Sequence, residues 1–338
     1  MDHEASRAVL IGVSDYDHAE FTPILAARNS VAAMQALLSD PDLCGWPRDR
    51  ITVISDPRSV TDLGMELTEL ARKTTGVFLL YYVGHGKVTE RGELCLTVSS
   101  TNPEHLNITG LRWETVRQAF LGSAARVRIA VLDCCFAGRA IEALSGTGDQ
   151  ALADLADIRG SYVLTAASSN NAAHVPPPDE QQNACTSFTA ELRDLVRAGI
   201  PGKPDWLSFS DIYPELRRRL RAKGLPTPER RGTNTADLFG FTMNAATRRV
   251  SDATASPDAS SQPHRVALDA DGIRHSREMA RAAELIVTLQ GAVDRVQADL
   301  EEARGLGDAS RVAALQQELA GRRALLDQAQ KGLQALDG

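Results

Sequence analysis

Aromatic residues are scarce in this 338-residue sequence: Phe, Tyr and Trp together make up 5% of it, and none lies beyond Phe241. Long hydrophobic runs are also missing, since no stretch approaches the roughly 20 apolar residues that a membrane-spanning helix needs. The first residues lack the charged start and the apolar stretch of a signal peptide. We therefore expect a cytoplasmic protein with no membrane partner.

Positive charge is not in excess either. The net charge is −7, with 43% hydrophobic and 24% charged residues, which is typical of a soluble globular protein and disfavours nucleic acid as a partner. Cysteines are few and irregularly spaced, so we expect reduced thiols rather than a disulfide framework, and their odd number leaves at least one of them free. They are Cys44, Cys95, Cys134, Cys135 and Cys185.

The composition changes near residue 250. A single hydrophobic core stops growing near about 250–300 residues, so two units are expected. Residues 251–265 are rich in Ser, Ala, Asp and Pro without apolar periodicity, as in a flexible linker. We assign residues 1–250 to a first domain, 251–275 to a linker and 276–338 to a second unit.

The second unit has the pattern of two amphipathic helices, at 276–303 and about 309–336, in which apolar residues recur at steps of three and four. The segment GLGD between them supplies two glycines for a chain reversal, which predicts an antiparallel, coiled-coil-like helical hairpin. A hairpin of two helices buries little surface alone. We expect it to pack on the first domain, on a second copy or on a partner protein, as a structural element or as a recruitment module.

Short apolar runs alternate with helical patterns in the first 250 residues. Runs without polar alternation indicate strands that are buried on both faces, and hence an α/β fold of three layers with a mainly parallel central sheet. Sites in such sheets lie beyond the carboxyl ends of the strands. The expected strands are residues 7–13, 51–55, 76–83, 127–133 and 161–166, with a further strand or hairpin at 93–98.

Two of these strands end in residues that can carry chemistry. The run at 76–83 is followed by GHG, with His85 at its centre, and the run at 127–133 is followed by Cys134 and Cys135. A thiol that attacks a carbonyl needs a base and donors for the oxyanion, and neighbouring strand ends can bring an imidazole within hydrogen-bond range of a thiol. The two strand ends together predict a functional Cys-His pair.

With this pair, residues 6–245 resemble the caspase-like cysteine peptidases, the clan of caspases, metacaspases and paracaspases, and most closely its bacterial branch with D-C-C-F-A/S-G at the nucleophile. A histidine about fifty residues upstream of the cysteine is a caspase signature. The segments TAASSNNAA (165–173) and TSFTAEL (186–192) follow in the family's order. The resemblance implies a caspase-like fold, with the helical hairpin outside it.

The resemblance also implies roles for individual residues. Cys135 would be the nucleophile and His85 the general base and acid, with the backbone N–H groups of Gly86 and Cys135 as oxyanion donors. Cys134 is expected to be a bystander packed in the core, because successive residues at a strand end point in opposite directions. We expect no third triad residue, no metal and no cofactor, and calcium activation is left open.

The specificity pocket is expected to involve acidic and small polar residues. Asp133 would either line the pocket and favour Arg or Lys at P1 or cap a turn. By the family pattern, Ser168 would reach the same pocket. Metacaspases commonly have an Asn-Asp pair in the first helix where this chain has Asn29 and Ser30, and Asp15 and Asp17 are candidates to supply the missing acid.

Two further segments are of interest. Residues 174–185 contain three consecutive prolines, which predicts an exposed, semi-rigid loop for substrate binding or processing. The charged residues at 217–219 (RRR) and 229–231 (ERR) are expected to be solvated on a helix and in a loop. The sequence PERRGT around the second group would also suit self-cleavage by a basic-specific peptidase.

These features predict a cysteine endopeptidase that acts on proteins or peptides, and the resemblance extends this to bacterial stress or antiphage signalling. Two alternatives stay open. One is a latent scaffold of the same fold that works through protein–protein contacts, and the other is a thiol hydrolase or transferase of a small molecule. The sequence gives no information on the natural substrate, the activating signal or the oligomeric state.

Overall fold

The computed structural model describes residues 3–136, 161–167, 173–232, 236 and 239–247, together with isolated positions between 296 and 331. It divides the chain into two units, Met1–Ser256 and Pro257–Gly338, which are treated separately below. The expected linker at 251–275 and most of the expected hairpin at 276–338 lie outside the described residues.

A six-stranded sheet forms the centre of the first unit, in the order β10-β8-β7-β3-β1-β2. All pairs are parallel except β10 with β8, so the prediction of a mainly parallel sheet is confirmed. Every residue of β3 is buried, as its uninterrupted apolar sequence requires. The strands are β1 (Arg7–Gly12), β2 (Ile51–Ser55), β3 (Val77–Val83), β7 (Val127–Asp133), β8 (Ser161–Thr165) and β10 (Glu229–Gly232).

The β10 strand corrects one expectation, because the charged residues at 229–231 form a strand and not a loop. They pair with β8 at the edge of the sheet, and the Arg230 guanidinium lies 4.5 Å from the centre of the Tyr213 ring. An edge strand tolerates charged side chains that would be costly in a central strand. Cleavage within PERRGT would therefore require β10 to leave the sheet.

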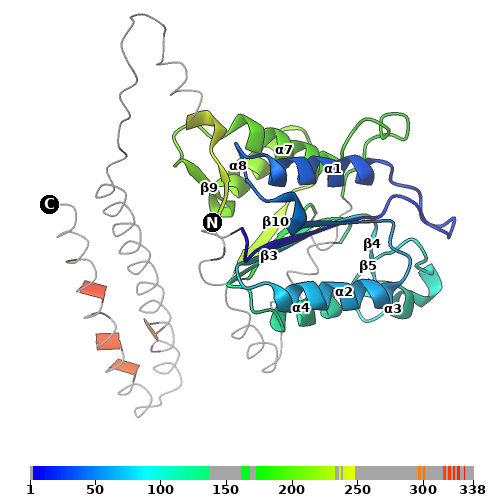
Figure 1. Ribbon diagram of the computed structural model, residues 1–338, viewed down its shortest axis with the longest axis horizontal. Coiled ribbons are helices and arrows are strands. Elements are labelled where there is room, and N and C mark those ends of the chain that lie inside the picture. Colours follow the sequence, from blue (N-terminus) through cyan, green and yellow to red (C-terminus); the bar gives the residue numbers. More distant parts are fainter. Residues whose placement is uncertain are drawn as a thin grey trace, which may run out of the picture. The chain divides into compact units, whose positions relative to one another are not determined.

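Helices cover both faces of the sheet (Figure 1). The face with α1, α7 and α8 buries one apolar cluster, and the face with α2 and α4 buries another. The N-terminus of α8 has a capping box, in which Ser208 and Asp211 exchange hydrogen bonds. The helices are α1 (Ala26–Ser39), α2 (Val60–Lys73), α3 (Leu106–Thr109), α4 (Trp113–Leu121), α7 (Ser187–Ala198) and α8 (Phe209–Ala222).

Two small sheets complete the first unit. The expected hairpin after His85 is confirmed, since β4 (Gly86–Val88) pairs antiparallel with β5 (Leu94–Leu96), which in turn pairs with β6 (Leu111–Arg112). The other sheet joins β9 (Trp206–Ser208) to β11 (Gly240–Met243). Within the described part of the chain, none of the helices combines the length and apolar composition that crossing a bilayer requires.

In the second unit, the described positions are helical. Val296 and Leu300, from the first amphipathic stretch, are buried together with Leu319 and Leu326 from the second. This contact is the one that an antiparallel pair of amphipathic helices would make at these positions.

Candidate active site

The two strand ends singled out in the sequence lie side by side. Strands β3 and β7 are parallel neighbours, and Val83 pairs with Asp133 at their carboxyl ends. His85 and Cys135 each follow two residues beyond this pair, so they leave the sheet at the same edge and in the same register. The Gly84 N–H faces the Asp133 carbonyl at 3.5 Å and keeps the two chains together beyond the strands.

His85, Asp133 and Cys135 line one cavity of about 190 Å³ at this edge. Its other walls come from the segment before α1 and from the segment before α7, which includes the proline-rich loop expected beside the site. The remaining lining residues are Thr22, Pro23, Ile24, Val83, Gly84, Ala173, Val175, Gln181 and Thr186.

The imidazole of His85 is held by the segment between β1 and α1. Its Nε2 lies 2.8 Å from the Thr22 carbonyl oxygen, and its backbone N–H donates to the Tyr16 hydroxyl at 3.0 Å. The rings of Tyr16 and Phe21 lie 5.1 and 5.6 Å from the imidazole, centre to centre. A carbonyl can only accept, so Nε2 carries the proton of the neutral ring and Nδ1 is left as the basic atom.

Burial keeps both members of the pair uncharged. It lowers the pKa of His85 below 6.5, against the opposing effect of the Thr22 carbonyl, and the nearby charge of Lys87 lowers this pKa further. Burial also raises the pKa of the Cys135 thiol above 9.0, an effect that the Ala173 backbone and Lys87 partly offset. The resting site therefore holds a thiol and a neutral imidazole rather than a thiolate–imidazolium pair.

Asp133 is buried, with 2% of its surface exposed. Its Oδ2 accepts hydrogen bonds from the hydroxyls of Thr186 (2.5 Å) and Thr189 (2.6 Å), while Oδ1 has no hydrogen-bond partner among the described residues. Burial raises the pKa of this carboxyl to about 6, against the effect of the two threonines. Asp133 therefore contributes a buried carboxyl to the wall of the cavity, with one oxygen held by the two threonines.

Gly86 lies directly against the nucleophile's backbone. A Cβ at this position would come within 2.0 Å of the Cys135 carbonyl oxygen, so no other residue fits without moving the chain. Cys134 is 1% exposed and packs in the apolar cluster on the α2 and α4 face, as expected of a bystander. Phe136, the residue after the nucleophile, has φ of 56°, a left-handed conformation that is uncommon for a bulky side chain and marks a sharp turn.

The structure does not bring every expected site residue to the cavity. Asp15 is not among the described residues that line it; its side chain is 65% exposed and lies 3.5 Å from the Arg28 guanidinium. A neighbouring cation on α1 pairs with Asp15 outside the cavity, so this position gives no support for Asp15 as a second acid, and that role stays a prediction. Ser168 lies outside the described residues, so its expected role stays a prediction.

Asn29 and Ser30, at the position of the expected Asn-Asp pair, hold the chain that precedes α7. The Asn29 side-chain amide lies within 2.9–3.1 Å of the carbonyls of Gln181, Gln182 and Ala184. The Ser30 hydroxyl accepts from the Thr186 N–H at 3.0 Å. These contacts anchor the loop at 174–185 to α1. Because this loop forms part of the cavity wall, α1 helps to fix the shape of the cavity.

The contacts of His85 were not apparent in the sequence. Thr22 contributes a backbone carbonyl, which any residue could supply, so no sequence pattern marks it. Tyr16 and Phe21 are isolated aromatics in a polar segment, and only the chain's return past the end of β3 places them on the imidazole. The repeated threonines of TSFT, by contrast, are a visible signal for the residues that hold Asp133.

Comparison with known proteins identifies the family. The model of the family described as the caspase domain matches residues 5–269, most of the chain. The chain therefore belongs to the caspase family, and the site lies in a cysteine peptidase domain that acts on protein substrates. No match was found among curated proteins.

Solved structures with similarity to the chain include two caspases. The crystal structure of caspase-1 from Spodoptera frugiperda is 9% identical, with 68% of this chain and 86% of that chain covered and a TM-score of 0.47. A structure of pro-Sf-caspase-1 is 10% identical, with coverages of 68% and 91% and a TM-score of 0.43.

Proposed function

We propose that the protein is a cysteine endopeptidase in which Cys135 is the nucleophile and His85 the general base and acid, and that it cleaves after Arg or Lys. One observation carries the proposal: the imidazole, the thiol and a buried carboxylate from two adjacent strand ends line the same cavity. A thiol beside a base supports covalent catalysis, and an unpaired acid supports recognition of a cation.

The chemistry follows from the protonation states. His85 Nδ1 takes the proton of the Cys135 thiol as sulfur attacks the scissile carbonyl carbon, and the resulting imidazolium gives that proton to the leaving amine. The products of this half-reaction are a thioester on Cys135 and the released amine. Water then attacks the thioester with His85 again as the base, which frees the acid product and restores the thiol.

The backbone around Gly86 supports the expected oxyanion site. The Thr97 N–H donates to the His85 carbonyl at 3.1 Å, which makes this pair a hydrogen-bonded position of the β4–β5 ladder. Such positions alternate along an antiparallel pair, so Gly86 occupies a non-hydrogen-bonded one and its N–H points away from β5. With the Cys135 N–H it would stabilise the oxyanion, each donor contributing on the order of 3 kcal/mol.

A positional-scanning peptide library tests the proposal most directly. We expect turnover of peptides with Arg or Lys at P1 and none with Asp, Glu or apolar residues. Cys135→Ala serves as the blank, since any cleavage that survives this substitution comes from a contaminant. A measured preference for Asp at P1 would be compatible with the Cys-His pair but would refute the role given to Asp133.

The pH dependence of the reaction follows from three shifted groups. The active base is neutral His85, which is present above its pKa, and the Asp133 carboxyl, with a pKa of about 6, must be ionised to hold a basic side chain. We therefore expect kcat/KM on Arg and Lys peptides to be high at neutral pH and to decline as the pH falls through about 6. Alkylation of Cys135 by iodoacetamide should be slow at neutral pH and increase through pH 9 and above, because the thiol pKa is raised. An alkylation rate that has already reached a plateau below pH 7 would instead demonstrate a preformed ion pair.

Calcium dependence, a role in stress or antiphage signalling and association through the C-terminal helices stay predictions. Measuring peptidase activity with and without calcium, and with a chain that ends at residue 256, would test the first and the last of these in one assay.

A further inference from the structure

Asp56 has an unusual backbone conformation at the same edge of the sheet as the site. It directly follows β2, its N–H donates to the Gly12 carbonyl at 2.8 Å, and its φ is 48°. Non-glycine residues seldom occupy this left-handed region, although Asp and Asn tolerate it best. Such a conformation persists where surrounding contacts hold it, and it is a reason to ask what the side chain does.

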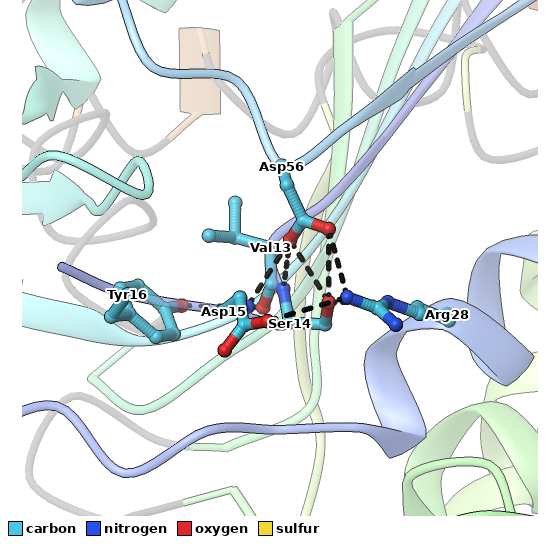
Figure 2. Close-up of polar contacts among 6 residues, drawn as sticks. All are labelled: Val13, Ser14, Asp15, Tyr16, Arg28 and Asp56. Atoms are coloured by element: carbon cyan, nitrogen blue, oxygen red, sulfur yellow. Dashed lines mark hydrogen bonds and ion pairs between the residues drawn. The ribbon is translucent and has the colours of Figure 1, made fainter.

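The carboxylate of Asp56 holds the residue at which the chain leaves β1. Oδ1 accepts from the Ser14 N–H at 2.6 Å, the Ser14 hydroxyl at 2.9 Å and the Asp15 N–H at 3.2 Å. Oδ2 faces the Arg28 guanidinium at 3.4 Å, and Arg28 Nε donates to the Ser14 hydroxyl at 2.7 Å. Figure 2 shows Ser14 between the carboxylate of Asp56 and the side chain of Arg28.

Ser14 is also the first residue of the loop that holds His85. Its carbonyl accepts from the Ile24 N–H at 2.9 Å, which closes the loop formed by residues 14–24. Tyr16 and Thr22, the residues of this loop that hydrogen-bond to His85, lie between the two closing residues. Asp56 itself is absent from the described residues that line the cavity.

We propose that Asp56 is a positioning residue for the peptidase reaction: it holds the loop at 14–24 so that the Tyr16 hydroxyl and the Thr22 carbonyl orient the imidazole of His85. The inference rests on the proposed function and deepens it. It predicts an effect on the base above all, because Tyr16 and Thr22 of this loop hydrogen-bond to His85. Residues 22–24 of the same loop also line the cavity, so a smaller effect on substrate binding is expected beside it.

Asp56→Gly separates the carboxylate from the backbone conformation, since glycine adopts a φ of 48° without strain. We expect kcat on a basic peptide to fall about tenfold or more, with a clearly smaller change in KM, which is the pattern of a misplaced catalytic group. The matched control is Asp49→Asn, before the other end of β2, whose exposed carboxylate lies 3.6 Å from the Arg50 side chain. It should behave as the unsubstituted protein.

A second measurement needs no turnover. In a Cys135→Ala background, an NMR titration of His85, assigned by comparison with His85→Ala, should give a pKa closer to 6.5 when Asp56 is replaced by Gly. A loosened loop exposes the imidazole to water, and burial is the main cause of its lowered pKa. Among the described residues, the titratable and charged groups around the ring are Tyr16 from the loop and Lys87 from β4, and Asp133 and Cys135 from the end of β7 line the same cavity.

An Asp56→Gly protein with unchanged kcat and an unchanged His85 titration would overturn the inference. If the peptidase proposal fails but the titration moves as expected, the positioning role survives, so the two failures are distinguishable. Should the glycine variant not fold, Asp56→Asn tolerates the same φ and removes the charge. The same two readouts then apply to it.

Discussion

Replacement of Cys135 by Ala, or of His85 by Ala, should each lower kcat/KM for a basic peptide by about 10³-fold or more. The reaction needs the Cys135 sulfur to form the thioester and His85 Nδ1 to take the thiol proton. Because the two residues act as one unit, removal of either one abolishes most of the catalysis that the pair provides. A double variant should therefore be little worse than either single one. The measurement is hydrolysis of a fluorogenic Arg or Lys peptide by the purified full chain.

Cys134→Ala is the matched control for this prediction. It removes a thiol from the adjacent position, but its side chain lies in the cluster on the α2 and α4 face and not in the cavity. We expect activity close to that of the unsubstituted protein and a small loss of stability from the lost packing. If Cys135→Ala kept its activity, or if Cys134→Ala alone lost it, Cys135 would not be the nucleophile.

The sequence was sufficient to predict the layers of the fold and the shared edge of the sheet beyond which His85 and Cys135 lie, for physical reasons. Strands buried on both faces have continuous apolar sequences, and the residues just beyond them must leave the sheet at its carboxyl edge. His85 and Cys135 could therefore be placed on a shared edge without coordinates, because each follows directly on such a strand.

The support around the pair could not be predicted in the same way. Asp15 was chosen for its nearness in the sequence, whereas its contacts depend on where α1 places Arg28. Asp56 is a single acidic residue in a turn, and its relation to His85 exists only through the packing of β2 beside β1 and the return of the loop at 14–24. Such contacts link short polar segments that carry no periodicity, so the sequence contains no pattern for them.

Asp133→Asn should change selectivity and stability in opposite directions. The amide can accept from Thr186 and Thr189 as the carboxylate does, but it presents no charge to the cavity. Removing one partner of a buried ion pair costs about 3–5 kcal/mol, so kcat/KM for Arg and Lys peptides should fall by at least about 10²-fold relative to peptides with a neutral P1 residue. Asp15→Asn, an exposed acid outside the cavity, should leave this preference unchanged.

The same substitution should stabilise the protein above neutral pH. The carboxyl has a pKa of about 6 in the fold and 3.8 as its ordinary value. Its folded pKa is raised, so the protonated form suits the fold and stability falls as the pH rises from about 4 to about 6, by up to about 3 kcal/mol. Asp133→Asn removes this loss, and at pH 8 its Tm should exceed that of the unsubstituted protein by about 6–12 °C, with the difference vanishing near pH 4. A lower Tm for Asp133→Asn at pH 8 would mean that the ionised carboxylate is stabilised in the fold, and that the buried acid is a structural anchor rather than a receptor for a basic side chain.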